Sequence, residues 1–357
     1  GFVLSYRYKN LLFRNQFNTS LNHADDSPYG SFSEYAELNP YWTPYDEAGN
    51  LKKIAGSTGG GGLIGVTKGN PLWNTTIGTK NFSAYTRLTD NFYIEWQILE
   101  ALKLRGRLGL TKIFNKREDF YPASHTYFLG YSKERTFEKG QYSKSNGESS
   151  SISADLTANY SLYLKKHQLL VNAGWSMQQN QSESTQFKVI GFPNDRINFI
   201  ASGLKPDNIQ PFSGNEGINR SISFLSALNY SYDDRYLADL SYRASASSLF
   251  GKENRWGHFW AAGLGWNLHK EHFLKNASWL KQFKLRASTG YTGAQNFSSY
   301  QALATFGYYQ TQVYDNWIGS YLMALPNDNL KWQKTLDYNI GVDINVMNRL
   351  SVRYDYY

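Results

Sequence analysis

Residues 152–177 read ISADLTANYSLYLKKHQLLVNAGWSM, and this stretch decides the fold. From Ile152 to Leu162 an apolar side chain occupies every second position, and Ser, Asp, Thr or Asn fills the positions between. The segment 165–167 (Lys-Lys-His) interrupts the pattern, which resumes from Leu169 to Met177. Successive side chains of a strand point to opposite faces. The stretch therefore predicts two strands joined by a tight turn, with one apolar and one polar face.

The same alternation recurs along the chain, and we expect about twelve strands. Further alternating segments are 4–8, 11–21, 82–98, 102–110, 222–232, 236–244, 256–268, 283–291 and 336–346. The connections also alternate in length. Tight or compact turns are predicted near residues 9, 100, 166, 234, 275 and 348, and looser connections at 23–81, 117–147, 186–217, 249–255 and 295–331. Short turns at one end and long loops at the other are typical of outer-membrane barrels.

Strand length supports the same interpretation. The expected strands of roughly 10–16 residues exceed the usual soluble length and fit a tilted membrane crossing. The sequence thus predicts an all-β protein, an antiparallel transmembrane β-barrel with long extracellular loops and short periplasmic turns. We expect it in a bacterial outer membrane, surrounded by outer-membrane lipid.

Composition excludes several classes of protein. The chain has 357 residues, a mean hydropathy of −0.55 and no run of eighteen apolar residues, so helical membrane spans are excluded. A net charge of +8 comes from 37 basic and 29 acidic residues that are scattered along the chain, so nucleic-acid binding is not expected. The absence of cysteine argues against a disulfide-stapled secreted module.

Both ends of the sequence alternate. The chain opens on Gly1-Phe2-Val3-Leu4, and residues 352–357 still alternate where it stops. A wide apolar sheet cannot leave two unpaired edges in lipid, because unpaired backbone groups are costly there. We therefore expect residues 1–357 to form one partial barrel domain, a fragment of a longer protein.

Several segments resemble one known family. Residues 29–35 (YGSFSEY) and 38–42 (LNPYW) look like the first long loop of SusC/RagA-type TonB-linked outer-membrane proteins. Further segments similar to that family are 235–243 (RYLADLSYR), 254–257 (NRWG), 262–266 (AGLGW), 285–293 (LRASTGYTG) and 326–335 (PNDNLKWQKT). In the last of these, Gln333 stands where the family commonly has Glu.

The resemblance implies a 22-stranded barrel with an N-terminal plug that contacts TonB. It also implies a SusD-like surface lipoprotein as partner and the TonB-energised import of glycan or peptide oligomers. The plug and the last strands would lie outside residues 1–357. No cofactor and no enzymatic activity are expected. A soluble β-rich carbohydrate-binding or adhesin domain is the alternative, against which the long strands and alternating connections argue.

Aromatic residues in the long loops are the candidate ligand contacts. These residues are Tyr41, Trp42, Tyr45, Trp73, Tyr314 and Trp317. Their flat faces could stack on sugar rings or hold peptide side chains. Loop packing and contact with a lid protein explain them better, because aromatic residues also dominate ordinary interfaces. Trp256, Trp260 and Trp266 are expected to face lipid or an interfacial girdle.

Two motifs resemble ligand sites by their letters alone. The pattern Gly60-x-Gly62-x-x-Gly65 matches a dinucleotide fingerprint, but no buried strand precedes it and Asn70-Pro71 should block a following helix. We interpret it as a flexible loop. Residues 269–272 (His-Lys-Glu-His) place two imidazoles and a carboxylate within one turn, but no third clustered ligand is evident, so no metal site is predicted.

Four carboxylates fall on the polar parity of their strands, namely Asp155, Asp239, Asp337 and Asp343. A glycosidase needs two carboxylates about 5–10 Å apart, which a sequence cannot exclude. The ordinary expectation inside a barrel is that they contact a plug or pair with arginines of the same face, which are Arg105, Arg107, Arg243 and Arg286. No Ser/His/Asp or Cys/His pattern predicts a catalytic nucleophile.

Overall fold

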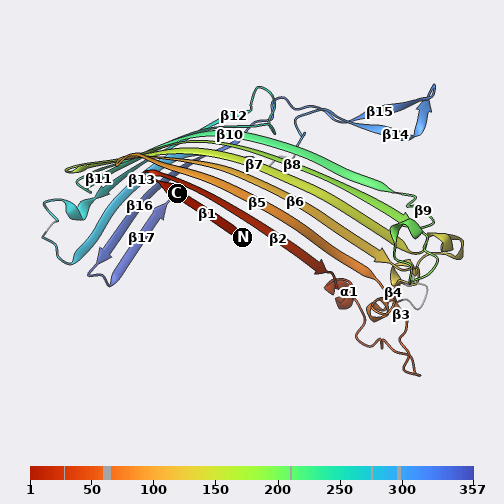
Figure 1. Ribbon diagram of the computed structural model, residues 1–357. Helices are drawn as coiled ribbons and strands as arrows, with labels where there is room; N and C mark the ends of the chain where they lie inside the picture. Colours follow the sequence, from red (N-terminus) through yellow and green to blue (C-terminus); the bar gives the residue numbers. More distant parts are fainter. Residues whose placement is uncertain (28, 59–65, 210, 275, 296–298) are drawn as a thin grey trace.

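The computed structural model describes residues 1–27, 29–58, 66–209, 211–274, 276–295 and 299–357. The main antiparallel sheet has thirteen strands, of which the short β9 (Lys205–Pro206) pairs with β8 off the main path. The other twelve follow one another in chain order across the sheet (Figure 1). They are β1 (Phe2–Tyr8), β2 (Leu11–Asp25), β5 (Lys80–Leu99), β6 (Leu102–Tyr121), β7 (Gln141–Leu164), β8 (His167–Ile190), β10 (Phe212–Tyr232), β11 (Tyr236–Ser247), β12 (Trp256–Asn267), β13 (Leu280–Ala294), β16 (Gln333–Val346) and β17 (Leu350–Tyr356). The predicted all-β antiparallel architecture is confirmed.

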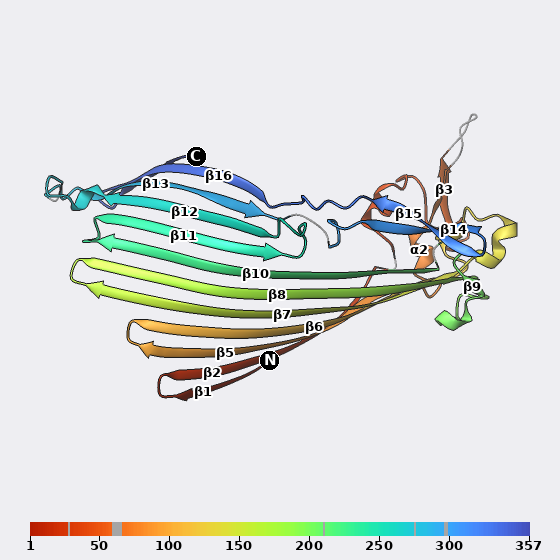
Figure 2. The same cartoon turned by 90° about the horizontal axis from the view of Figure 1, so that it is seen from above.

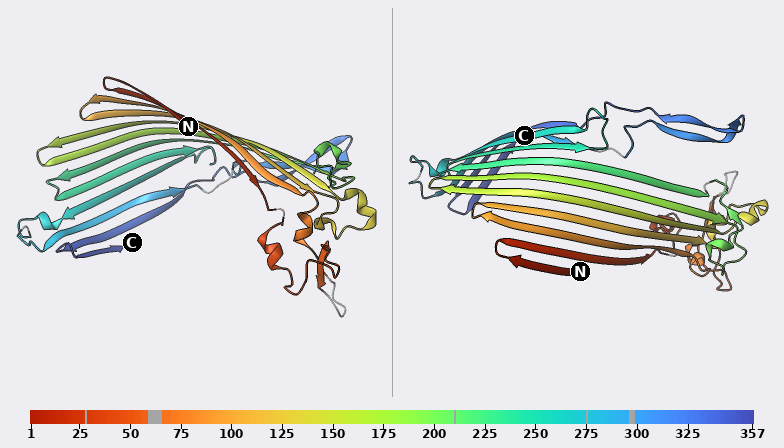
Figure 3. Two further views of the ribbon diagram at one scale, coloured as in Figure 1. Left: turned by 60° about the horizontal axis from the view of Figure 1, so that its bottom comes forward. Right: turned by 45° about the horizontal axis from the view of Figure 1, so that its top comes forward.

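The sheet is curved, and β1 and β17 lie at its two edges (Figure 3). Short turns gather at one end of the strands, whereas most of the longer connections gather at the other (Figure 2). The short turns need left-handed backbone at their centres, as two-residue hairpins of matching twist do. Lys165 has φ 47°, Asp233 and Asp234 have φ 53° and 50°, and Met347 and Asn348 have φ 51° and 55°.

The loop end carries small elements of its own. They are α1 (Phe32–Ala36), β3 (Ile54–Thr58), β4 (Val66–Gly69), α2 (Pro71–Asn74), η1 (Thr126–Phe128), η2 (Lys133–Glu138), η3 (Ile200–Ser202) and β9 (Lys205–Pro206). The hairpin of β14 (Thr305–Tyr314) and β15 (Trp317–Ala324) extends away from the main sheet (Figure 3), and η4 (Leu268–Lys270) lies at the turn end. No helix among the described residues is long and apolar enough to cross a membrane.

The register of the β7–β8 hairpin confirms the two-faced interpretation of residues 152–177. Leu156 pairs with Trp175, and Asp155 pairs with Ser176. Paired residues of an antiparallel ladder share a face. The apolar face continues from Trp175 to Phe224 on β10. We call the face that carries Leu156 the lipid-facing side and the face that carries Asp155 the polar face.

The central strands are longer than the sequence pattern predicted. β7 and β8 have 24 residues each, and β6 has 20. The loops predicted at 117–147 and 186–217 are correspondingly shorter, because β6 runs to Tyr121, β7 starts at Gln141 and β10 starts at Phe212. Beyond the membrane both faces of a strand meet water, so the alternation that marks a strand disappears. At about 3.3 Å per residue, 24 residues span about 80 Å, which is more than a bilayer needs.

One local prediction is wrong. The dipeptide Asn70-Pro71 does not block a helix, because α2 begins at Pro71 and the Asn70 side chain caps it by accepting from the Leu72 N–H at 3.1 Å. Proline suits the first helical position, where its missing N–H would have no partner. The pattern Gly60-x-Gly62-x-x-Gly65 lies outside the described residues.

Candidate functional site

The polar face of the sheet carries paired charges in its turn-end half. The Arg107 Nε donates to the Asp155 carboxylate at 2.7 Å across β6 and β7. Glu95 on β5 lies 2.5 Å from the Lys103 ammonium and 3.3 Å from the Arg105 guanidinium. These charged groups therefore satisfy one another within the sheet.

The remaining predicted carboxylates also find donors on neighbouring strands. Asp343 binds Arg286 at 3.1 Å, and Arg286 also reaches Asp355 at 2.8 Å. Asp239 accepts from the Asn229 amide at 2.5 Å, and Asp337 accepts from the Thr292 hydroxyl at 3.1 Å. Arg243 instead donates to Ser245 and Ser223 at 2.9 and 3.3 Å. The expected pairing with arginines is thus found for Asp155 and Asp343, whereas Asp239 and Asp337 accept from neutral side chains.

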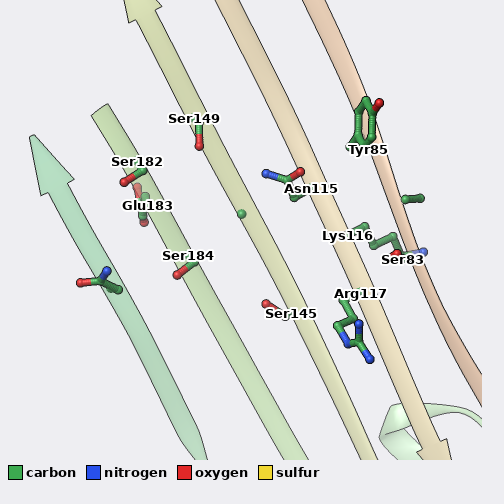
Figure 4. Close-up of a pocket in the computed structure, with 13 residues that line it drawn as sticks. Ser83, Tyr85, Asn115, Lys116, Arg117, Ser145, Ser149, Ser182, Glu183 and Ser184 are labelled. Carbon is green, nitrogen blue, oxygen red and sulfur yellow. The ribbon is translucent and has the colours of Figure 1, made fainter. Parts of the chain in front are cut away.

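Toward the loop end, the polar face forms a groove that is lined mainly by neutral side chains. Two adjoining pockets of about 410 and 320 Å³ lie along strands β5 to β10 and share Ser149 and Ser182. Figure 4 shows the first of them. Short hydroxyl and amide side chains line both pockets. We define the serine groove by Ser83, Ser145, Ser149, Ser151, Ser182, Ser184, Asn115, Asn180, Asn215 and Asn219.

The chemistry of the serine groove is that of many weak, neutral hydrogen bonds. Each hydroxyl donates one hydrogen bond and accepts others, and each amide does both. One guanidinium, that of Arg117, also lines the first pocket, but it is already paired, because it lies 2.8 Å from Asp26 and 3.0 Å from Asp119. The strand register turns the side chains of Lys116 and Glu183 to the opposite face. The groove therefore suits a neutral ligand that is rich in hydroxyl or amide groups.

Sequence reasoning missed the serine groove. Residues 141–151 and 178–190 alternate poorly because both faces there are polar, so the sequence pattern predicts loops over part of them. One usable signal is the absence of proline between Pro122 and Pro193, since proline is confined to edges and interruptions of sheets.

Three of the six candidate aromatic residues belong to the loop cluster, by which we mean the contacting loop segments 42–56, 70–75 and 121–131. The Trp42 indole packs against Gly56, where an added Cβ would lie 2.3 Å from the ring. Tyr45 forms a β-bridge with Leu51 and is 51% exposed. The Trp73 indole N–H donates to the Ser124 carbonyl at 3.1 Å. Trp42 and Trp73 thus pack the loops.

The other three aromatic residues are strongly exposed. Tyr41 is 90% exposed in the first long loop. Tyr314 and Trp317 oppose each other at the tip of the β14–β15 hairpin and are 85% and 77% exposed. Figure 1 places this hairpin and the β3–β4 hairpin on opposite sides of the sheet. The six residues do not form one site, and none of them lines the serine groove.

A histidine is held neutral in the loop cluster. The half-buried His125 imidazole stacks on Tyr121 with 4.5 Å between ring centroids. Burial lowers the pKa of His125 to about 4, and the nearby Lys53 ammonium acts in the same direction. Its Nδ1 accepts from the Tyr127 N–H at 3.0 Å. This contact requires the unprotonated nitrogen.

The His269–His272 segment supports the turn end of the sheet. The Glu271 carboxylate is 8% exposed and accepts from the Trp266 indole at 3.0 Å and the Tyr236 hydroxyl at 2.8 Å. These bonds, with the charge of Arg235, hold the pKa of Glu271 below its usual range. The His269 Nδ1 accepts from the Phe283 N–H at 3.2 Å. Within the described part of the chain, no three His, Asp or Glu side chains are grouped to hold a metal ion.

Comparison with known proteins assigns this fold. The family described as "TonB dependent receptor-like, beta-barrel" matches residues 7–357. The chain is 29% identical over 273 residues to TonB-dependent receptor P3 of Formosa agariphila, covering 75% of this chain and 26% of that protein. It is 38% identical over 135 residues to TonB-dependent receptor SusC of Bacteroides thetaiotaomicron, covering 36% of this chain and 14% of that protein.

Solved structures share the same architecture. The RagAB peptide importer in its "closed-closed" state matches with a TM-score of 0.80 and 20% identity, over 98% of this chain and 38% of that chain. Its "open-open" state matches with a TM-score of 0.79 and 19% identity, over 97% of this chain and 37% of that chain. Of the two curated receptors named above, the chain covers 26% and 14%, which is about a quarter of their length or less.

Proposed function

This chain belongs to the TonB-dependent receptor-like β-barrel family, and on that premise we propose that the protein imports a neutral oligomer through its barrel. The chain is a β-barrel segment of a bacterial outer-membrane receptor of the SusC/RagA type. The family consists of transporters and receptors, not of enzymes. The alternative of a soluble carbohydrate-binding or adhesin domain is set aside because it does not agree with this family.

The serine groove is the observation that supports the proposal. It lies on the polar face, at the end of the sheet where the long loops gather, so an arriving solute would meet it first. Its neutral hydroxyl and amide groups match the hydroxyls of a glycan or the backbone of a peptide. RagAB is described as a peptide importer, and SusC as a TonB-dependent receptor. The substrate class is accordingly a glycan or peptide oligomer.

Two partners complete the proposal. TonB would supply the energy, through a region outside residues 1–357. A SusD-like surface lipoprotein would cover the loop end and retain the oligomer. The RagAB importer is described in a "closed-closed" and an "open-open" state, and we propose that the cover of the present barrel likewise opens and closes. In the present chain, the exposed aromatic residues Tyr41, Tyr314 and Trp317 are the proposed contacts for the cover or the oligomer.

The test is Ser149→Trp in the full-length protein, compared with Asn146→Trp. Ser149 lines the serine groove, whereas Asn146 lies on the same strand, three residues away, on the opposite face. An indole in the groove should raise the oligomer concentration needed for half-maximal uptake about tenfold, which corresponds to about 1.4 kcal/mol. Asn146→Trp should leave uptake unchanged. Labelled glycans and peptides of matched length, with and without TonB, identify the cargo and its energy source.

The surface amount of each variant must be measured in parallel. If Ser149→Trp reaches the outer membrane normally and imports both oligomers as the parent protein does, the groove does not bind the cargo. If uptake persists without TonB, the proposed energy coupling is wrong.

A further inference from the structure

The lipid-facing side of β6 changes character along its length. Leu108 and Leu110 continue the apolar band of this face, since Leu110 pairs with Ile152. The next positions on the same face are Lys112, Phe114 and Lys116, followed by Glu118 and Phe120. A charged region therefore begins directly beyond the apolar band, on the side of the sheet away from the serine groove.

A buried carboxylate organises the charges of this region. Glu118 accepts from the Lys80 ammonium at 2.7 Å and from the Tyr142 hydroxyl at 2.6 Å. Lys116 lies 2.9 Å away and Lys144 lies 3.9 Å away. The Glu118 side chain is 7% exposed, whereas the three lysines are 35–47% exposed. Three cations thus surround one anion and point toward the membrane side with a surplus charge of +2.

A fourth lysine lies closer to the apolar band. Lys112 is two positions beyond Leu110 and pairs with Glu148 at 2.6 Å. We call Lys80, Lys112, Lys116 and Lys144 the lysine belt. Glu118 and Glu148 neutralise two of these four cations, and the register sets two further carboxylates, Glu183 and Glu216, beside Glu148 on the same face. The surplus positive charge therefore lies around Glu118.

Aromatic rings hold parts of the belt in place. The Lys80 and Lys116 ammonium groups lie 5.0 and 5.3 Å from the centroid of the Phe82 ring. Lys112 lies 5.3 Å from the Phe114 ring. An ammonium over an aromatic face is attracted by the ring and loses freedom. The belt is therefore partly ordered before any ligand arrives.

The height of the lysine belt above the apolar band points to its ligand. A rise of about 3.3 Å per residue and a strand tilt of about 40° give a vertical rise of about 2.5 Å per residue. Lys112 then stands about 5 Å and Lys116 about 15 Å beyond Leu110. With Leu110 at the end of the apolar band, the head groups and sugars of the outer leaflet would lie in this interval. The long strands β5 to β7 carry the belt into that layer.

We propose that the lysine belt binds the phosphate-bearing head group of an anionic glycolipid of the outer leaflet. Basic residues beside an apolar membrane surface attract anionic head groups. Glu118 acts as a positioning residue, because it gathers three ammonium groups whose mutual repulsion would otherwise separate them. The proposal concerns the lipid-facing side and does not depend on the cargo of the barrel.

The experiment uses full-length protein purified in detergent, freed of lipid and titrated with bacterial lipopolysaccharide. The belt variant is Lys80→Gln/Lys116→Gln/Lys144→Gln. Its control, Lys103→Gln/Lys188→Gln/Lys284→Gln, removes the same charge from the polar face. Each lysine at a lipid surface contributes about fivefold, so the belt variant should bind about 100-fold more weakly, while the control binds normally. Native mass spectrometry counts the bound glycolipid.

Two further arms separate the ligand from other sources of the same chemistry. Dephosphorylated lipopolysaccharide should bind the parent protein as weakly as the phosphorylated form binds the belt variant. Inorganic phosphate at the same concentration should not compete. Glu118→Gln should weaken glycolipid binding and lower the melting temperature without lipid, because the three ammonium groups lose the carboxylate that gathers them.

Several results would overturn the proposal. Equal loss of binding in the belt and control variants would show a general charge effect. Equal binding of the dephosphorylated form would show that the lysine belt does not recognise the phosphate groups. Competition by inorganic phosphate would make this a free-phosphate site. If the triple variant does not assemble, Lys116→Gln alone should weaken binding about fivefold, and unchanged binding by that variant refutes the belt.

Discussion

The Arg107 guanidinium and the Asp155 carboxylate are joined across β6 and β7 at 2.7 Å, on the face opposite Leu156. This pair marks the polar face at a height where the other face is apolar. The two charges are 40% and 31% exposed, so water still screens them. The pair therefore identifies the polar face of the sheet but contributes little to the stability of the sheet.

The energy of that pair is therefore expected to be small. A double-mutant cycle with Arg107→Ala and Asp155→Ala should give a coupling energy of about 0.5–1 kcal/mol. The measurement is the free energy of unfolding of the full-length barrel in urea, in lipid vesicles. A coupling of several kcal/mol would mean that this part of the polar face is dry.

Leu156→Arg and Thr157→Arg should separate the two faces. An arginine at a lipid-facing position near the middle of the membrane costs about 2–4 kcal/mol, whereas the polar face accepts it. Leu156→Arg should therefore reduce the folded, heat-modifiable barrel far more than Thr157→Arg does. Leu156→Trp is the control, since lipid accommodates the ring but a close-packed protein core does not. Equal damage from the Trp and Arg variants at Leu156 would place that side chain against protein.

His125 should make the loop cluster sensitive to acid. Its pKa is about 4 in the folded protein and about 6.5 when unfolded, so the unfolded state binds the proton more readily. The stability that depends on neutral His125 is complete above pH 6.5 and is lost as the pH falls toward 4, by at most about 3 kcal/mol. Hydrogen exchange of residues 121–131, corrected for intrinsic rate, measures this loss. In His125→Gln the acid-dependent part should disappear, and its persistence would assign the sensitivity to another group.

The orientation of the sheet can be tested by labelling. The chain has no cysteine, so single cysteines report cleanly once any elsewhere in the full-length protein are replaced. Ala48→Cys lies in the first long loop and Lys166→Cys lies at the β7–β8 turn. A maleimide that cannot cross the membrane should label the first on intact cells and the second only after lysis. The reverse pattern would invert the assigned sides.

The membrane half of the fold could be predicted because lipid enforces alternation. Residues 152–162 carry it plainly, and the structure places them on β7 with the expected faces. The loop-end half lacks that constraint. Ser145 and Ser149 lie in a segment where neither face is apolar, so their strand and their groove had no sequence signal of the usual kind. For the same reason, the sequence did not predict local structure within the long loops, such as the β14–β15 hairpin.

Candidate ligand residues were harder to predict than the fold. Aromatic residues were candidate ligand contacts because of their side-chain chemistry alone. The actual contacts depend on how the loops pack, since Trp42 contacts Gly56 and Trp73 contacts Ser124. Such contacts join residues that are far apart in the sequence, so no periodicity of the sequence predicts them. The lysine belt also needed the register, since Lys80, Lys116 and Lys144 come from three strands.

The pairing of each strand with its sequence neighbour has a consequence for the kinetics of folding. Hairpins with two- or three-residue turns close quickly, because little chain entropy is lost before their contacts form. In this sheet β1–β2, β5–β6, β7–β8, β10–β11 and β16–β17 are such hairpins. The pairs β2–β5 and β13–β16 must first bring together strands separated by long connections. We therefore expect hairpins to form as units and then to join, with these two junctions as the slow steps of assembly.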